Sequence, residues 1–299
     1  MKKEITHYSR VYLKLVLAMS IWGGTFVPAR ILSQEFSAVT ISFYRFLIAS
    51  IFLLTVLVHR KQHHLQLSFQ NISLMSILGL SGIFAYNIFF FLGVQTVAAG
   101  KASVIISINP AITALFASLF LKEIMGWKKL VGVFLALFGV ITVISQGDYN
   151  SILNGGFDIG EAYLIGCVFS WLVYTVVGKK ALKKFNSLQA TTWACVFGTI
   201  FLFPFAIYDG IQIFPYHASF TQWSYLLYLG VFGSALAFMW FYEGVKYLGA
   251  GKAASFINIS PMVGLITGFL FLNETIDLSL LMPELPEVSL TCNLTLTIS

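Results

Sequence analysis

Two prolines with polar neighbours stand inside long apolar stretches, and they are the first residues that could do chemistry. Pro110 lies in SINP and Pro261 in NISP. Within a helix, proline removes one backbone hydrogen bond and frees the carbonyl four residues earlier. We therefore predict kinked helices at both prolines, with polar groups that either line a substrate cavity or bond a neighbouring helix. The polar candidates for substrate binding here are Ser107, Asn109, Asn258 and Ser260.

Aromatic and amide side chains in other apolar stretches extend this candidate site. Asn87 lies in GIFAYNIFFF and needs a polar partner, either in a cavity or on another helix. Trp22 and Trp171 offer faces for stacking or cation–π contacts, although most aromatics in membrane helices pack or anchor at the interface. The substrate-binding candidates are completed by Tyr86 and Tyr174.

Charged residues are scarce inside the apolar stretches. Arg45 is the only basic residue well within one, and an intramembrane charge is a functional hypothesis by default, but a structural role remains open. Glu123 and Glu274 follow apolar stretches and are expected to cap the next helix. No Asp or Glu lies in the middle of any stretch, which favours a facilitator or weakly coupled exporter.

Catalytic chemistry finds no support in the sequence. All five histidines lie outside the apolar stretches, and neither HExxH nor a pair of aspartates occurs. We therefore predict a protein that is not an enzyme, with no catalytic residue, metal or cofactor.

The composition predicts a membrane protein. Hydrophobic residues make up 58% of the 299 residues and charged residues only 10%, against typical values of about 45–50% and about 25%. So few charges cannot cover a soluble surface, and most of this chain must face lipid or other protein.

Nine apolar stretches are long enough to cross a bilayer as helices. A crossing needs roughly 20 residues, and lipid admits only helices or closed barrels. The stretches show no two-residue alternation, so we expect an all-α integral membrane protein. They are 11–31, 37–58, 73–94, 99–121, 127–145, 159–178, 187–208, 223–245 and 252–272.

The basic residues predict the orientation. With the N-terminus in the cytoplasm, 15 of the 18 Lys and Arg residues lie on the cytoplasmic side, which agrees with the positive-inside rule. This distribution explains the net charge of +6 without nucleic acid. We expect a multi-pass protein of the cell (inner or plasma) membrane, with the lipid bilayer as its partner.

A long repeat joins the two parts of the chain. GKASVIISINPAITALFASLFLKE (100–123) and GKAASFINISPMVGLITGFLFLNE (251–274) agree at 10 of 24 positions. Weaker matches, at offsets of 149 to 151, pair the first four stretches with the sixth to ninth. Because the first unit has five helices, an odd number, the second unit is expected to be inverted, as in many secondary transporters.

Three regions follow from this repeat. Residues 1–148 form a first unit of five helices, and residues 149–277 form a second unit of four. The tail, 278–299, contains two prolines and two glutamates within PELPE, which disfavour a membrane helix. We expect the tenth helix to be missing; the alternative is a diverged tail that still docks.

Four segments carry a recognisable pattern: WGGTFV (22–27), YRFLIAS (44–50), INPAITALFASLFLKE (108–123) with Gly132 and Gly139 beyond it, and SPMVGLITGFLFLNE (260–274). By these segments the chain resembles the EamA family of the drug/metabolite transporter superfamily over about residues 11–277. This resemblance implies ten helices in an inverted five-plus-five repeat and export of small metabolites such as amino acids.

The sequence therefore predicts a carrier that exports a small polar or amphipathic metabolite by alternating access. The alternative is a truncated, inactive or regulatory membrane protein of the same fold. A channel is less favoured, because neither a ring of charges nor a filter motif is visible.

Overall fold

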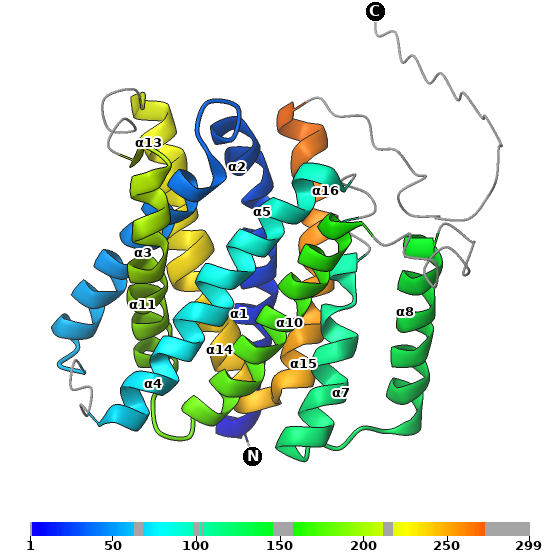
Figure 1. Cartoon of the computed structure of the whole chain (residues 1–299). Coiled ribbons are helices and arrows are strands. Elements are labelled where there is room, and N and C mark those ends of the chain that lie inside the picture. Colours follow the sequence, from blue (N-terminus) through cyan, green and yellow to red (C-terminus); the bar gives the residue numbers. More distant parts are fainter. Residues whose placement is uncertain are drawn as a thin grey trace, which may run out of the picture.

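The computed structural model describes residues 2–62, 68–97, 102, 105–145, 158–211 and 218–272, and every regular element in these ranges is helical (Figure 1). The first half contains α1 (Lys2–Gly24), α2 (Phe26–Leu32), α3 (Ala38–His59), α4 (Phe69–Leu78), η1 (Gly79–Ala85), α5 (Tyr86–Thr96), α7 (Asn109–Leu121) and α8 (Trp127–Ser145). The second half contains α10 (Ile159–Ala181), α11 (Ser187–Tyr208), α13 (Phe220–Leu227), η3 (Tyr228–Leu236), α14 (Ala237–Leu248), α15 (Ala250–Ser255), η4 (Phe256–Asn258) and α16 (Ile259–Leu272).

Polar side chains mark the starts of five of these helices. Each accepts a backbone N–H from the first turn: Ser37 caps α3, Ser68 caps α4, Asp158 caps α10, Asn186 caps α11 and Ser219 caps α13. The last three form capping boxes, in which the side chain three residues later bonds back to the capping residue. These short polar signals separate the apolar stretches and fix where each helix begins.

Seven helices are long and apolar enough to cross a membrane, which confirms a multi-pass membrane protein. They coincide with seven of the nine expected stretches. A shorter apolar helix, Ile105–Leu121, occupies the fourth stretch, and α8 has 19 residues in the fifth. The count of nine crossings stays a prediction, and the tail at 278–299 lies outside the described residues. The seven helices are Tyr8–Leu32, Ala38–His59, Phe69–Val94, Ile159–Ala181, Ser187–Tyr208, Phe220–Leu248 and Ala250–Phe271.

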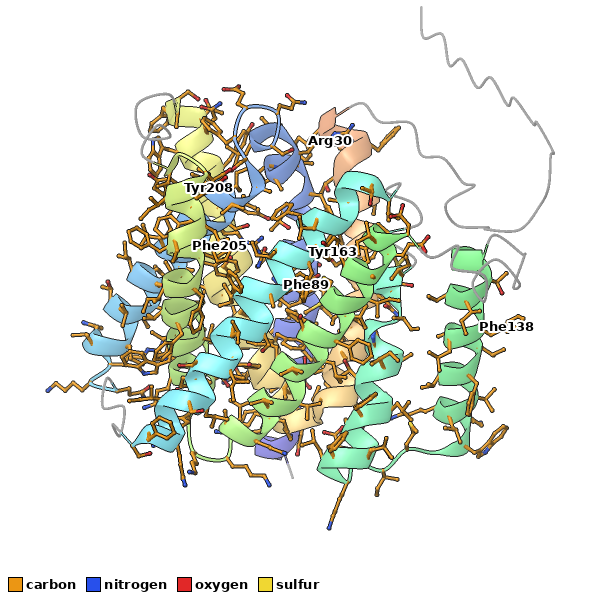
Figure 2. The ribbon with its side chains drawn as sticks, in the orientation of Figure 1. Arg30, Phe89, Phe138, Tyr163, Phe205 and Tyr208 are labelled. Carbon is orange, nitrogen blue, oxygen red and sulfur yellow. The ribbon has the colours of Figure 1, made fainter. Side chains whose placement is uncertain are left out.

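Large apolar side chains cover the outside of the bundle. Ile51 on α3 is 58% exposed, and Phe138 on α8 is 61% exposed. Figure 2 shows Phe138 projecting away from the other helices, on a helix at the edge of the bundle. In water such a surface would drive association, whereas in a bilayer it meets hydrocarbon tails.

The third span of each half packs against the first span of the other half. The third span of the first half, α4–η1–α5, packs on α10, the first span of the second half. Correspondingly, α13–η3–α14 packs on α1. The closest approaches also correspond: a β-carbon at Gly93 would lie 2.7 Å from Leu164 Cγ, and one at Gly244 would lie 2.6 Å from Leu15 Cδ2. The repeated glycines therefore allow the same close helix packing twice.

Each third span contains a π-helical segment at an equivalent position. The segments η1 and η3 overlap the matching sequences LGLSG (78–82) and LGVFG (229–233). A β-carbon at Gly82 would lie 2.1 Å from the ring of Tyr174 on α10, and one at Gly233 would lie 2.8 Å from Thr25 Cγ2. Such widened turns often accompany functional sites, and both are oriented towards the other half.

The end of the bundle that contains the N-terminal part of α1 and the last turn of α10 is here called the basic end. Polar contacts join neighbouring helices there. Lys14 Nζ lies 2.7 Å from Glu243 Oε2, which ties α1 to α14. Lys179 Nζ donates to the carbonyl of Val245 at 2.6 Å, which ties α10 to α14. The last turn of α10 therefore lies at the same end as the first part of α1, and the two helices run in opposite directions (Figure 1).

The connectors after α3 and α10 also meet at the basic end. Asn186 Nδ2 donates to Gln62 Oε1 at 3.0 Å, and Gln189 Nε2 donates to the Gln62 carbonyl at 3.0 Å. The predicted topology requires these two connectors to lie on one face, and the direct contact between them satisfies that requirement.

The opposite end carries its own contacts between the halves. Gln222 Nε2 donates to Glu35 Oε2 at 2.8 Å. Asp209 accepts hydrogen bonds from Ser37 and Thr40 at the start of α3. Polar contacts thus connect the two halves at both ends of the bundle in this conformation.

Candidate functional site

Trp22 and Trp171 meet at the centre of the bundle. Their ring centroids lie 5.5 Å apart at an interplanar angle of 78°. Phe238 packs against both indoles, at 5.3 Å and 5.8 Å. The two tryptophans come from equivalent positions on α1 and α10, so both halves contribute to one centre. We call this set the central aromatic cluster: Trp22, Tyr86, Trp171, Tyr174, Phe238, Phe241 and Tyr242.

Only some of the polar atoms in the central aromatic cluster have a hydrogen-bond partner. Trp22 Nε1 donates to the carbonyl of Gly233 at 2.8 Å. In contrast, Trp171 Nε1 and the Tyr174 hydroxyl are buried and find no partner within the described residues. A buried polar atom without a hydrogen bond costs about 1–3 kcal/mol, and each such atom needs an explanation. A water or a polar group of a ligand would satisfy both donors.

Tyr86 and Asn87 differ although they are adjacent on α5. The ring of Tyr86 lies 5.3 Å from that of Trp171 and belongs to the central aromatic cluster. Asn87 is buried, and its Nδ2 donates to the carbonyl of Ile83 one turn earlier on the same span, at 2.5 Å. This contact uses one of the two N–H donors of the amide and lies within the same span, so the role of Asn87 in a cavity or at another helix stays a prediction.

Both prolines follow interruptions of a helix. Pro110 occupies the first turn of α7, directly after a turn at Ile108. Pro261 lies in the first turn of α16, after the 3-10 segment η4. Proline fits the first turn of a helix, because its missing N–H would have no partner there. The fourth and ninth stretches are therefore interrupted helices, with the proline just beyond each interruption.

The polar residues beside the prolines divide into two pairs. Ser107 and Asn258 are exposed, whereas Asn109 and Ser260 are buried. Asn109 Oδ1 has no partner within the described residues. Ser260 lies next to α1, because a β-carbon at Gly23 would come within 2.6 Å of its carbonyl oxygen. The buried pair stays in the candidate site, whereas the exposed pair is not part of the buried core.

Arg45 lies beside this cluster and was not among the substrate-binding candidates, although the sequence left a functional role open for it. Its Nε donates to Ser234 Oγ at 2.5 Å, and its guanidinium carbon lies 5.2 Å from the centroid of the Phe46 ring. Within the described residues, no carboxylate lies within 4 Å of it. A signal was present in the sequence, because Arg45 is the only basic residue well inside an apolar stretch.

Glu123 caps a helix of the other half. Its carboxylate accepts the N–H of Ala250 at 2.7 Å and of Gly251 at 3.2 Å, at the start of α15. The expectation that it caps the next helix, α8, was therefore wrong. The packing of α7 on α15 brings the end of one helix to the beginning of the other.

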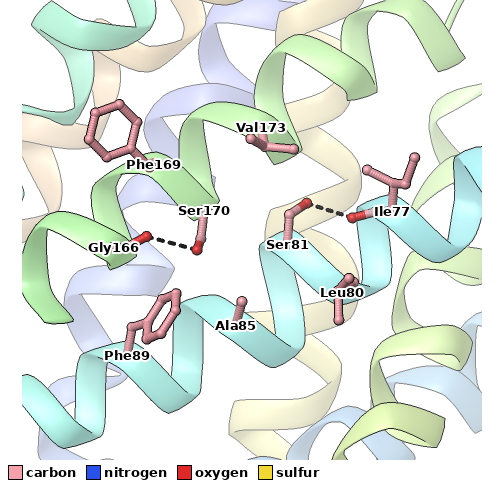
Figure 3. A pocket seen from close by; sticks show the side chains of 9 residues that line it. All are labelled: Ile77, Leu80, Ser81, Ala85, Phe89, Gly166, Phe169, Ser170 and Val173. Carbon is pink, nitrogen blue, oxygen red and sulfur yellow. Dashed lines mark hydrogen bonds between the residues drawn. The ribbon is translucent and has the colours of Figure 1, made fainter.

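An apolar groove of about 320 Å³ lies apart from the cluster, between the third span and α10 (Figure 3). The hydroxyls of Ser81 and Ser170 donate to the carbonyls of Ile77 and Gly166 on their own helices. The groove therefore presents few polar atoms, and exposed side chains such as Phe169 place it on the outer surface. None of the residues predicted for the substrate site lines it. The lining is Ile77, Leu80, Ser81, Ala85, Phe89, Gly166, Phe169, Ser170 and Val173.

Comparison with known proteins supports a transporter. An "Uncharacterized transporter" of Archaeoglobus fulgidus is 32% identical over 269 residues, covering 90% of this chain and 91% of its own. The "Uncharacterized transporter YyaM" of Bacillus subtilis is 27% identical, covering 87% and 85%. A "Probable terminal-alkyne amino-acid exporter" of Streptantibioticus cattleyicolor is 25% identical, covering 89% and 86%.

A solved crystal structure shares the fold, with a TM-score of 0.69 at 17% identity, and the match covers 91% of this chain and 92% of that one. Residues 9–145 and 158–282 each match the family described as "EamA-like transporter family". These two matches cover most of the chain, and the chain belongs to the EamA-like transporter family.

Proposed function

We propose that this protein is a secondary transporter that exports small metabolites by alternating access. Its two halves form an inverted repeat, and the substrate binds between them at the central aromatic cluster. The N-terminus and the basic end face the cytoplasm, in the cell (inner or plasma) membrane. The units at 1–148 and 149–277 are the two bodies that move against each other.

The single observation that supports this proposal most strongly is the meeting of Trp22 and Trp171. Equivalent residues of the two halves contact each other at the centre, at 5.5 Å between ring centroids. When the two halves move relative to each other, a site shared in this way becomes accessible first from one side of the membrane and then from the other. Neither an enzyme nor a receptor needs equivalent residues from two oppositely directed halves at one centre.

The contacts at the two ends suggest the gates. Glu123 with Ala250 and Gly251 joins the halves at the basic end, and Glu35 with Gln222 joins them at the opposite end. Opening either side requires one set to break while the other holds. The packed cluster between them fits a closed state, from which either side opens.

The chemistry of the cluster favours an amphipathic, amino-acid-like substrate. Aromatic faces accept apolar or cationic groups, and the unsatisfied Trp171 and Tyr174 donors require a polar partner. The name of the Streptantibioticus relative refers to an amino-acid exporter. We extend that activity class to this chain as part of the proposal.

Asn109→Leu combined with Ser260→Leu tests the site. Both residues are buried, and leucine removes their polar atoms. We expect efflux of amino acids from proteoliposomes to fall at least tenfold, with membrane insertion unchanged. Thr55→Leu is the control, because Thr55 is exposed on α3 and bonds only its own helix. Unchanged efflux in the double variant, at wild-type insertion, would refute this site.

The alternative is a non-transporting, inactive or regulatory protein of the same fold. It is motivated by the PELPE sequence after residue 282, which disfavours a membrane helix. Adding a tenth apolar helix in place of 278–299 separates the two proposals. Efflux that appears only in the extended protein would support the alternative.

A further inference from the structure

We propose that Arg45 binds the carboxylate of the transported solute, which makes this site selective for amphipathic monocarboxylates. This inference rests on the proposed function and deepens it by naming the charged group that the site recognises.

Arg45 lies deep in the bundle. It is seven residues from the start of α3, so at 1.5 Å per residue it lies about 10 Å into the helix. Its neighbours on α3 include Phe43 and Phe46, which are buried. A guanidinium at this depth is expensive unless an anion or a strong hydrogen-bond network compensates it. Arg45 nevertheless keeps some accessible surface, which leaves it open to a ligand.

The protein itself compensates this charge only in part. Ser234 Oγ accepts from Nε, and Phe46 presents its ring to the guanidinium. Both partners are neutral, and within the described residues no carboxylate lies within 4 Å. An arginine has five N–H donors, of which this hydrogen bond uses one. The other edge of the guanidinium, which matches a carboxylate in two parallel bonds, remains without an anion.

Arg45 is continuous with the central aromatic cluster. One residue, Gly233, touches both: its carbonyl accepts from Trp22 Nε1, and a β-carbon at this position would lie 3.8 Å from Arg45 Nη2. Tyr86, whose ring packs on Trp171, also lies within electrostatic range of the guanidinium. A ligand with its charged group on Arg45 would therefore place its body against the aromatic rings.

The unsatisfied groups in this region are mostly donors. The indole N–H of Trp171 and the hydroxyl of Tyr174 have no partner within the described residues, and their side chains are 5% and 0% exposed. Together with the free N–H groups of Arg45, they require acceptors. A carboxylate supplies only acceptors, with two oxygens and about four lone-pair directions. The Trp171 indole and the Arg45 guanidinium can only donate, so they favour a ligand group that supplies acceptors over a simple amine.

The number of cations limits the charge of the ligand. Arg45 is the only basic residue well inside an apolar stretch, so one negative charge is balanced and a second would remain unpaired. A dianionic phosphate is therefore disfavoured, although arginine also pairs with phosphate elsewhere. The aromatic walls favour an apolar body on the same molecule. 2-Oxo acids with aromatic or branched side chains meet both conditions, and amino acids meet them when their ammonium group lies against an aromatic face.

Matched pairs of acid and amide test this inference by binding, without requiring transport. The purified full-length protein is titrated with L-phenylalanine, L-leucine and 3-phenylpropanoate and with the corresponding amides, and tryptophan fluorescence and melting temperature are followed. We expect at least one acid to bind at least tenfold more tightly than its amide. Arg45→Gln should weaken binding of that acid 10- to 100-fold and leave its amide unchanged, and Arg45→Lys should restore part of the affinity.

Two further variants separate this role from a purely structural one. Ser234→Ala keeps the charge but removes the hydrogen bond that orients the guanidinium, so we expect an intermediate loss of acid affinity. Arg30→Gln removes an exposed cation from the end of α2 and should leave every affinity unchanged. Melting temperatures without ligand report whether each variant folds.

Three outcomes would overturn the carboxylate site: equal binding of acid and amide, full acid binding by Arg45→Gln, or no acid binding by the wild type. Transport is measured separately in proteoliposomes. Arg45-dependent binding of an acid that is never moved would uphold the carboxylate site and contradict the proposed transport function.

Discussion

Trp22 and Trp171 form an edge-to-face pair at the centre of the bundle, yet only one of the two indole N–H groups has a hydrogen-bond partner. Trp22 Nε1 donates to the Gly233 carbonyl, while Trp171 Nε1 has no partner within the described residues. The two residues occupy equivalent positions in the two halves. The pair is therefore symmetric in packing and asymmetric in hydrogen bonding, which assigns Trp22 a structural bond and leaves Trp171 free for a ligand.

Phenylalanine at each position tests this assignment. Both substitutions remove the same atoms, and only Trp22→Phe removes a hydrogen bond within the described residues. We expect Trp22→Phe to be less stable than Trp171→Phe by about 0.5–1.5 kcal/mol, because it loses the hydrogen bond to the Gly233 carbonyl. Conversely, Trp171→Phe should impair ligand binding more. Thermal unfolding in detergent and fluorescence titration measure the two effects, and equal losses of stability would contradict the assignment.

The Glu123 carboxylate is expected to hold the basic end closed. Glu123→Gln keeps the shape but replaces charge-assisted bonds to Ala250 and Gly251 by weaker neutral ones. A loss of about 1–2 kcal/mol changes the population of the open state by a factor of about 5–30. We expect faster maleimide labelling of a cysteine placed at the buried Ala253, in a protein without its three native cysteines.

Glu35→Gln is the matched control for this experiment. It removes one carboxylate from the opposite end, where Glu35 accepts from Gln222. Labelling at position 253 should stay at the wild-type rate or fall. Faster labelling in both variants would indicate general loosening rather than a gate at the basic end.

Gly249 should not tolerate a side chain. Its φ of +95° is rarely adopted by L-residues, and a β-carbon there would lie 2.8 Å from Glu123 Oε1. We expect Gly249→Ala to cost about 1–3 kcal/mol and to displace the carboxylate from the start of α15. Gly132→Ala is the control, because a β-carbon at Gly132 on α8 meets nothing within 4 Å. Equal melting temperatures of the two variants would show that this contact is unimportant.

Side-specific labelling tests the proposed orientation. Single cysteines at Lys61 and Lys184, which are both exposed in the connectors after α3 and α10, should react only from the cytoplasmic side. A cysteine at Tyr208, which is 96% exposed at the end of α11, should react only from outside. The labelling uses a membrane-impermeant maleimide on intact cells and inverted vesicles. Reaction of positions 61 and 184 from different sides would exclude the inverted arrangement.

Much of the fold could be predicted because it depends on local signals. Apolar length, glycine and capping residues such as Asp158 and Asn186 act within a few positions, and seven expected stretches are confirmed as long apolar helices. The family was also correctly identified, from sequence motifs that lie mostly within these helices. The helix interruptions near Pro110 and Pro261 were harder to place. A proline indicates that a helix is interrupted, but it does not determine whether the interruption lies before or after the proline.

The site could be predicted only in outline. Trp22 and Trp171 were identifiable because the repeat relates them, and Tyr86 joins them through packing. The contacts of Arg45 with Ser234 and of Glu123 with Ala250 join residues 189 and 127 positions apart, and they depend on how one half is placed against the other. No periodicity within a single helix contains that information. For the same reason the sequence grouped Ser107 and Asn258 with buried partners, although both are exposed.

The π-helical turns at η1 and η3 each hold about one more residue than a regular turn, which makes the two third spans differently sensitive to deletions along their length. Deleting one residue within Gly79–Ala85 should return this segment to regular helix and keep the residues beyond it near their present direction, whereas deleting one residue from the regular helix α4 would rotate everything beyond it by about 100°. Tyr86 would then lose its contact with the indole of Trp171, and Gly93 would no longer face Leu164. A single-residue deletion in α4 should therefore abolish assembly of the two halves, while a deletion of one non-glycine residue within η1 should be tolerated.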